Sequence, residues 1–177
     1  MIFSIGIIID RLFEVYVNMR FLVISVGKVR EPYLNTGVKD FLTRLRPYVS
    51  VEYIEGLEQK TPPNPSPAQV DAVLSKEGQK VLSLLKEGDY LIALDSKGQS
   101  MTSEALAARV EDLINYGHSR LVFVVGGSHG LTLQLLKRAD LVLSFSPLTF
   151  PHQLAVLMLL EQIYRSFKII RNEPYHK

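Results

Sequence analysis

The sequence predicts an α/β domain with a mainly parallel sheet and helices on both faces of that sheet. Short apolar runs alternate along the chain with longer segments whose apolar residues recur at helical spacing. The apolar runs show no regular alternation with polar residues, which is typical of strands buried on both faces. With 177 residues, 47% of them hydrophobic and 21% charged, the chain has the size and composition of one globular domain.

The first strand, helix and second strand are separated by glycine and proline. Residues 21–27 form an apolar run that closes at a glycine, and residues 33–45 follow with helical spacing until Pro47 stops the helix. Residues 49–54 then predict a second strand.

A proline-rich segment separates this unit from the next. Residues 61–67 predict an extended loop that leads into a helix over residues 68–86. Residues 90–95 predict the third strand, and residues 96–99 predict a turn after it.

The sequence predicts both ends of the next helix. Thr102 or Ser103 is expected as its N-cap, and the helix should run to Tyr116 because Gly117 suits a C-terminal stop. Residues 121–125 predict the fourth strand.

The last part of the chain adds one more strand and a long apolar helix. Residues 126–130 should turn into a short helix that runs through Lys137, residues 141–144 predict a fifth strand, and a turn with two prolines leads to the final helix. Residues 155–160 are apolar in every direction around the helix axis. The outer side of this helix needs a cover, and a second subunit in a two-fold dimer is the simplest one.

Composition narrows the classes of function. The chain has no cysteine, which excludes disulfides, thiolate metal sites and cysteine nucleophiles and suits a reducing cytoplasm. Its four histidines show no HExxH pairing, so we expect no dedicated metal site. The net charge of +2 is too small for a protein that wraps nucleic acid but allows a local basic patch.

The first eighteen residues differ from the rest. The apolar run over residues 2–9 is too short to span a bilayer and has neither a basic residue before it nor a cleavage site after it. Met19 directly precedes the first strand, so residues 1–18 are interpreted as an N-terminal extension. It is either an appended or mis-assigned start or a short amphipathic surface helix.

Three strand ends predict a ligand crevice, because ligands of open parallel sheets lie beyond the carboxyl ends of the strands. These ends carry Leu94-Asp95, Gly126-Gly127 and residues 144–146. Four motifs at and after these ends resemble the RlmH family of SPOUT-class methyltransferases: Val124-Val-Gly-Gly127, Leu143-Ser-Phe-Ser-Pro-Leu-Thr-Phe-Pro-His152, Glu161-Gln-Ile-Tyr-Arg165 and Asn172-Glu-Pro-Tyr-His-Lys177.

The resemblance covers residues 19–177 and implies a SPOUT methyltransferase domain. Members of this family use S-adenosylmethionine to methylate ring nitrogen 3 of a pseudouridine in 23S ribosomal RNA, on assembled ribosomes. The family also implies a homodimer and a C-terminal trefoil knot. No metal or membrane is implied.

The resemblance also implies site residues. The cofactor-binding positions would be Leu94, Gly126, Gly127, Phe145, Ser146, Pro147, Leu148, Thr149 and Phe150. The acceptor side would fall on Arg165, Tyr175 and His176, with His152 nearby.

Physical chemistry gives these residues roles and leaves alternatives open. The acceptor nitrogen carries a proton at neutral pH, so either His152 or His176 serves as base or a cation such as Arg165 stabilises the developing anion. Tyr175 suits stacking on the target base. Structural alternatives are a hydrogen bond from His152 to the first helical turn and an ion pair of Arg165 with Glu161.

Two rival functions follow from the same residues. Gly126-Gly-Ser-His-Gly130 fits the G-x-S-x-G pattern of a serine hydrolase, with Ser128 as nucleophile and Asp140 and His152 in the expected order. The remaining chain is short for that fold, and the C-terminal motif is left without a role. The other rival is a non-catalytic RNA-binding dimer in which the glycine loop only packs.

Overall fold

The computed structural model describes residues 19–176. The interpretation of residues 1–18 as an extension, and any role of Lys177, lie outside these residues. No helix within the described range is long and apolar enough to cross a membrane.

The sheet has five strands, all parallel, in the order β2-β1-β4-β3-β5. This confirms the predicted α/β class, and the alternation seen in the sequence explains it, because each crossover carries a helix. The strands are β1 (Arg20–Ser25), β2 (Ser50–Glu55), β3 (Tyr90–Ser100), β4 (Arg120–Val125) and β5 (Leu141–Ser144).

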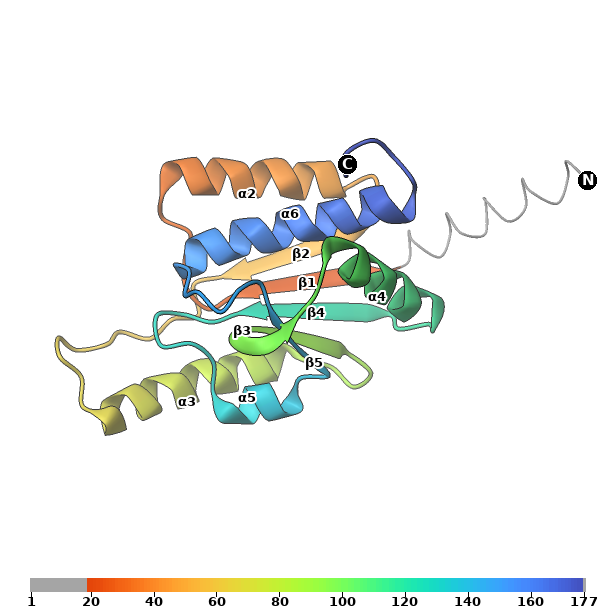
Figure 1. Cartoon of the computed structure of the whole chain (residues 1–177). Coiled ribbons are helices and arrows are strands. Elements are labelled where there is room, and N and C mark those ends of the chain that lie inside the picture. Colours follow the sequence, from red (N-terminus) through yellow and green to blue (C-terminus); the bar gives the residue numbers. More distant parts are fainter. Residues whose placement is uncertain (1–18, 177) are drawn as a thin grey trace, which may run out of the picture.

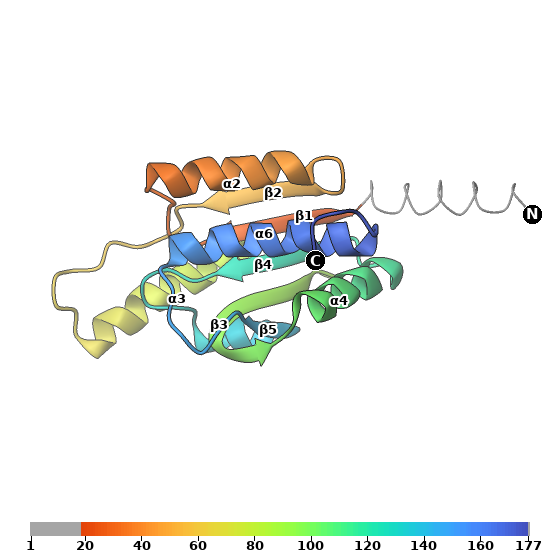
Figure 2. The same cartoon turned by 45° about the horizontal axis from the view of Figure 1, so that its top comes forward.

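Helices cover both faces of the sheet, as Figures 1 and 2 show. On one face α6 lies between α2 and α4, and α3 and α5 cover the other face. The helices are α2 (Pro32–Leu45), α3 (Pro67–Leu84), α4 (Ser103–Asn115), α5 (Leu133–Arg138) and α6 (His152–Ile170).

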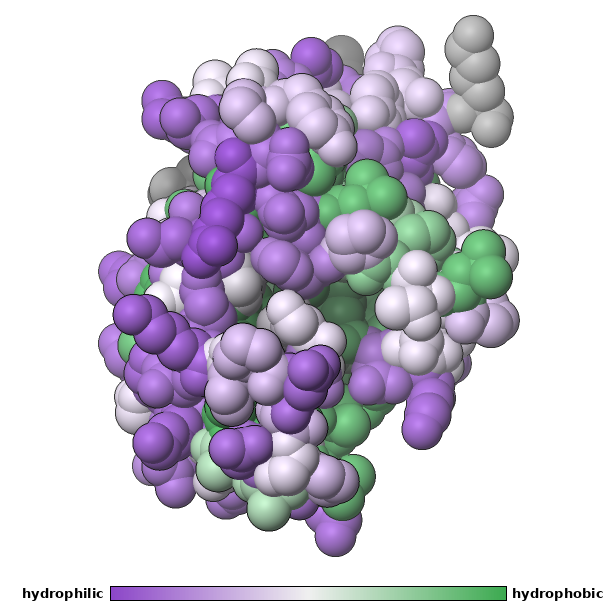
Figure 3. Space-filling model, turned by 90° about the vertical axis from the view of Figure 1, so that its left-hand side faces the viewer, coloured by the Kyte–Doolittle hydropathy of each residue, from purple (hydrophilic) through white to green (hydrophobic). Residues whose placement is uncertain are grey.

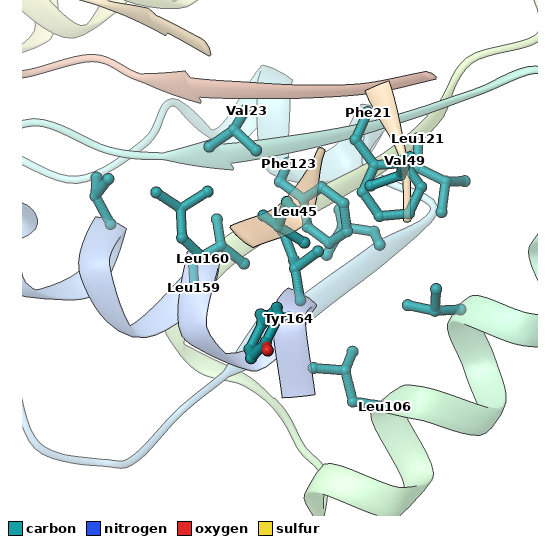
Figure 4. Close-up of a cluster of buried hydrophobic side chains, with 14 of the residues drawn as sticks. Phe21, Val23, Leu45, Val49, Leu106, Leu121, Phe123, Leu159, Leu160 and Tyr164 are labelled. Atoms are coloured by element: carbon teal, nitrogen blue, oxygen red, sulfur yellow. The ribbon is translucent and has the colours of Figure 1, made fainter. Parts of the chain in front are cut away.

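Alternate residues of the central strands enter two separate cores. Phe21 and Phe123 face α6, and their ring centroids lie 5.5 Å apart. Figure 4 shows this cluster, in which Leu159, Leu160 and Tyr164 of α6 pack below the strands. The residues that alternate with them along the strands, such as Val122 and Val124, face α3 and α5. Both faces of the sheet are therefore buried, as the uninterrupted apolar runs predicted.

The helix ends that the sequence predicted lie within two residues of those in the structure. Thr102 is the N-cap of α4, since its hydroxyl accepts a hydrogen bond from the Ala105 N–H at 3.1 Å. Gly117 follows the helix with φ +82°, which only glycine adopts without strain. Helix α3 ends at Leu84 and not at residue 86.

The predicted turn over residues 96–99 is wrong, because β3 continues to Ser100. Gln99 and Ser100 pair with Leu143 and Ser144 of β5 after a shift in register that follows Leu94. Gly98 makes this possible, since a Cβ there would lie 2.6 Å from the Val142 carbonyl oxygen. A polar segment can thus be a strand where its partner strand lies at the edge of the sheet.

Helix α6 runs along the strands, from their carboxyl ends toward their amino ends, as Figures 1 and 2 show. Within the described chain, α2 and α4 flank it, and each of its residues is buried or half-buried. The cover predicted from its apolar surface is therefore largely supplied within one chain. The second subunit and the trefoil knot stay predictions.

Candidate functional site

A pocket of about 570 Å³ opens at the carboxyl edge of the sheet. Figure 3 looks onto this edge and shows an apolar hollow between more hydrophilic walls. Its volume lies in the range of small-molecule sites. Its walls come from the ends of β3, β4 and β5 and from the turn into α6: Leu94, Asp95, Ser96, Val125, Gly126, Gly127, Ser128, Gly130, Leu143, Phe145, Ser146, Leu148, Thr149, Phe150, Pro151, His152 and Ala155.

The glycine loop after β4 folds back on itself. Gly127 and Gly130 form an antiparallel bridge, and the Gly130 N–H donates to the Gly127 carbonyl at 3.2 Å. A Cβ on Gly126 would lie 2.7 Å from the backbone of Gly130. The loop can therefore close only because position 126 has no side chain, and closing it presents bare backbone to the pocket.

The turn between β5 and α6 forms the opposite wall. The Ser144 hydroxyl lies 3.1 Å from the carbonyl oxygens of both Ser96 and Ser146, which ties the turn to β3. The Leu148 N–H donates to the Ser146 hydroxyl at 3.0 Å, while the Leu148 side chain is 69% exposed. Pro147 and Pro151 fix φ on both sides of these contacts. The turn is thus shaped in advance of any ligand.

His152 begins α6 and lies in the pocket wall. Its Nε2 is 3.1 Å from the Lys28 carbonyl oxygen, on the connection between β1 and α2. The predicted hydrogen bond to the first turn of its own helix is not made. The partner is instead a segment that is distant in sequence.

Asp95 lies in the pocket wall, at one of the three strand ends that the sequence predicted for the crevice, but it had no predicted role there. Within the described pocket lining, Asp95 and His152 are the two residues with acidic or imidazole groups. Asp95 Oδ1 accepts the Lys97 N–H at 2.8 Å, so the carboxylate is held where the pairing register of β3 shifts. Its position as the last residue of the predicted strand 90–95 was the signal available in the sequence.

The C-terminal residues form a separate cluster around Glu161. Its Oε1 accepts from Arg165 Nη2 at 2.6 Å and from the Tyr175 hydroxyl at 3.0 Å, and the Arg165 guanidinium lies 4.8 Å from the centroid of the Tyr175 ring. Burial, and then the hydrogen bond to Glu161, raises the pKa of Tyr175. The structural alternative for Arg165, an ion pair with Glu161, is therefore formed, and Arg165 also contacts the C-terminal tail. Its role at the acceptor side stays a prediction.

His176 closes this cluster with both ring nitrogens. Arg165 Nη1 lies 3.3 Å from Nδ1, and Glu104 Oε1 lies 2.8 Å from Nε2. The Glu104 carboxylate also accepts hydrogen bonds from its own backbone N–H and from the Thr102 side chain. These two bonds, together with the one from His176, lower the pKa of Glu104 to about 2. The tail is therefore anchored on α4 and α6.

The pocket and the C-terminal cluster lie at opposite ends of α6. His152 and Arg165 are thirteen residues apart on one helix, a separation of about 20 Å at the usual helical rise. One chain therefore brings the predicted cofactor positions, with the exception of Pro147, into one pocket lining together with His152. It does not bring Arg165, Tyr175 and His176 to them.

The serine-hydrolase geometry is absent from the described chain. Ser128 lies in the glycine loop at the carboxyl edge. Asp140 precedes β5 at the amino edge, where its Oδ2 accepts the Leu91 N–H at 2.7 Å. A triad of Ser128, Asp140 and His152 cannot form across the sheet. Nor do residues 19–176 contain a group of three or more acidic or histidine side chains that could hold a metal ion.

Comparison with known proteins identifies the family to which the chain belongs. A solved structure described as a probable methyltransferase from Bordetella pertussis Tohama I has a TM-score of 0.51 at 10% identity and covers 89% of this chain and 99% of that one, which is a likeness of fold. Curated proteins from Halothermothrix orenii and Alkaliphilus oremlandii, both called Ribosomal RNA large subunit methyltransferase H, are 47% and 48% identical over 159 residues. These matches cover 90% of this chain and 100% of each relative.

The family described as "Predicted SPOUT methyltransferase" matches residues 19–176, which is the whole described structure. The resemblance drawn from the C-terminal motifs is confirmed. With a crevice at the ends of β3, β4 and β5 and a family match over residues 19–176, the chain belongs to the SPOUT methyltransferase family.

Proposed function

We propose that the protein transfers a methyl group from S-adenosylmethionine to large-subunit ribosomal RNA, at ring nitrogen 3 of a pseudouridine in 23S RNA of assembled ribosomes. The observation that carries this is the pocket at the carboxyl edge, where a closed glycine loop faces a proline-held turn. Support also comes from relatives of about the same length whose name is that of a ribosomal RNA methyltransferase.

The pocket residues fit the cofactor. Bound S-adenosylmethionine supplies a methyl group on a sulfonium, which needs positioning more than it needs acid or metal assistance. The bare backbone at Gly126 and Gly127 leaves room for a nucleoside, and the turn from Phe145 to Phe150 offers backbone donors and acceptors to an adenine edge. Leu94 would line the same nucleoside site, and the Asp95 carboxylate suits ribose hydroxyls or an ammonium group.

The acceptor side requires a second copy of the chain. Arg165 suits stabilisation of the anion that develops on the pseudouridine ring, and Tyr175 suits stacking on that ring. Because both lie at the far end of α6 from their own pocket, a homodimer that sets the tail of one protomer against the pocket of its partner would complete the site. His176 would enter the same composite site.

A methylation assay on ribosomes that lack the modification tests the proposal. We expect one methyl group per large subunit, which mass mapping would locate on a pseudouridine in 23S RNA. If the protein binds S-adenosylmethionine in calorimetry but methylates no RNA, the proposed methyltransferase activity is contradicted. Absence of binding at millimolar S-adenosylmethionine would favour the non-catalytic RNA-binding dimer.

Mixing two inactive variants tests the shared site. A Gly126→Ala protein keeps its tail, and a protein that lacks residues 175–177 keeps its pocket. We expect each to be inactive alone and the mixture to recover up to about a quarter of wild-type activity, because random exchange gives half heterodimers with one complete site each. A mixture as inactive as its components would contradict the composite site.

A further inference from the structure

The imidazole ring of His152 lies directly against Gly27. A Cβ on Gly27 would lie 2.5 Å from Nε2 and 2.7 Å from Cδ2 of this ring. Gly27 is not one of the glycines with positive φ, so its backbone does not require glycine. The absent side chain at position 27 therefore serves the ring of His152 and not the local chain path.

The contact with Lys28 fixes the tautomer of His152. A carbonyl oxygen only accepts hydrogen bonds, so the short contact at 3.1 Å places the ring proton on Nε2. Nδ1 then carries the lone pair. Among residues 19–176 no hydrogen bond to Nδ1 occurs, and the ring belongs to the pocket wall.

A neighbouring side chain holds the same segment in place. Gln153 Oε1 accepts the backbone N–H groups of Arg30 and Glu31 at 2.6 and 3.0 Å. Three hydrogen bonds, one from His152 and two to Gln153, thus join the first turn of α6 to the segment of residues 27–31. This is the arrangement in which a base is oriented by a third group.

His176 is arranged in the opposite way. Arginine only donates, so Arg165 occupies the lone pair on Nδ1, and the Nε2 proton is directed at Glu104. Both nitrogens of His176 are therefore engaged. Of the two candidate bases, His152 is the one with an acceptor nitrogen available in a pocket.

We infer that His152 is the general base of the methyl transfer and that Gly27 and the Lys28 carbonyl are its positioning groups. The inference rests on the proposed function. The N3 proton of the pseudouridine passes to His152 Nδ1 while N3 forms a bond to the methyl carbon and the sulfur–methyl bond breaks, with its electron pair going to sulfur. The imidazolium then releases its Nδ1 proton to water, while the other ring proton stays on Nε2 and remains hydrogen-bonded to the Lys28 carbonyl oxygen throughout.

Few other charges face the ring. Asp95 lies in the β3 wall of the pocket, and Lys28, Arg30 and Glu31 lie on the segment between β1 and α2. Neither the glycine loop nor the turn before α6 adds an acidic or basic side chain to the pocket lining. A second protomer would add Arg165 and His176.

A matched pair of alanine substitutions tests the positioning role. Gly27→Ala should displace the His152 ring and lower kcat at least about ten-fold, since misplacement by 1 Å can cost about a hundred-fold. In the control Gly37→Ala, the new Cβ on α2 would lie 2.9 Å from Leu157. Leu157 is in α6, as is His152, but does not line the pocket. That control should stay within about two-fold of wild type.

Nitrogen-detected NMR of the imidazole rings reads the same effect without turnover. In the wild-type protein His152 should show the Nε2–H tautomer, and Gly27→Ala should shift its ring signals. Gly37→Ala should leave them unchanged. Equal kcat in the two alanine variants, or a His152 ring that is protonated on Nδ1, would overturn the positioning role.

The pH dependence of kcat separates the two histidines. His152→Gln keeps a donor for the Lys28 carbonyl but cannot accept a proton, so kcat should fall about a hundred-fold or more and lose its decline at acidic pH. Imidazole in the buffer should restore part of the activity of His152→Ala. His176→Ala should keep the acidic decline, and any other pattern across these variants would overturn the base assignment.

Binding measurements distinguish failure of this inference from failure of the proposed function. Wild-type protein and His152→Gln should bind S-adenosylmethionine with affinities within about three-fold of each other. If the wild-type protein does not bind it, the proposed function fails. If both bind and both methylate at the same rate, only the base assignment fails.

Discussion

Gly126 shows how one missing side chain shapes a cofactor site. We expect Gly126→Ala to weaken S-adenosylmethionine binding at least about ten-fold in calorimetry, because the new Cβ would lie 2.7 Å from the Gly130 backbone and the loop must open. Gly88→Ala is the control. It strains a backbone with φ +82° but meets nothing within 4 Å, so it should cost about 1 kcal/mol of stability and leave binding unchanged.

Arg120 and Asp89 form the most deeply buried of the ion pairs among residues 19–176, with side-chain exposures of 13% and 3%. Arg120→Ala should lower the free energy of unfolding by about 3 kcal/mol in urea titrations, because it leaves a buried carboxylate without its partner. Arg44→Ala, which breaks a pair that is 50% exposed on both sides, should cost about 0.5 kcal/mol or less. Similar losses in both would contradict the burial argument.

The same pair gives stability a defined dependence on pH. Burial raises the pKa of Asp89, but hydrogen bonds from Arg120 and the Lys86 N–H outweigh it and hold the pKa below 3.8. The unfolded chain then binds a proton first, so the stability from this pair is complete above pH 3.8 and is lost as the pH falls through the folded value. The variant Asp89→Asn with Arg120→Leu should show a flatter stability curve between pH 5 and 3.

Single residues were predictable where their chemistry is local. Thr102 as a cap and Gly117 as a stop depend on backbone geometry within one turn, and both are confirmed. The contact of His152 with Gly27 and Lys28 joins positions that are far apart in sequence. No local rule predicts such a pair from one sequence, although the glycine that ends the first strand was visible.

At the scale of elements, α3 offers a direct test of capping. The Ser66 hydroxyl accepts from the Gln69 N–H at 3.3 Å, and the Gln69 side chain accepts from the Ser66 N–H at 2.8 Å. Ser66→Ala should therefore lower the midpoint of thermal unfolding by an amount equivalent to about 1 kcal/mol. Ser75→Ala, at an exposed position within the same helix, should leave stability unchanged or slightly higher.

Elements with strong periodicity were predicted, and the one with weak periodicity was not. Five strands and five helices in the described chain occupy nearly the predicted ranges, because apolar runs and caps mark them locally. The second half of β3 is polar and contains Gly98, so it resembles a turn. Its strand conformation comes from pairing with β5, which is a tertiary interaction that overrides local propensity.

For the whole molecule we expect a dimer. Sedimentation equilibrium at micromolar concentration should give twice the mass of 20.0 kDa, because the proposed site needs a tail and a pocket from different copies. A protein that lacks residues 175–177 should keep the fold and cofactor binding while turnover is abolished. A stable wild-type monomer that still methylates ribosomes would contradict this architecture.

The arrangement of the two half-sites was not predictable from the sequence. Resemblance assigned both sets of residues, but only the structure shows that one helix keeps them apart. We therefore expect a partner subunit because of the distance between Arg165 and the pocket, and no longer because of the apolar surface of α6.

Because α6 carries a wall of the pocket on its first turn and Arg165 farther along, its length acts as a ruler for the composite centre. Inserting one residue between these points would rotate the distal end by about 100° and advance it by about 1.5 Å. Deletions and insertions there should be far less tolerated than in the connection over residues 56–65. The length of α6, more than any single contact, therefore sets the spacing between the two halves of the active site.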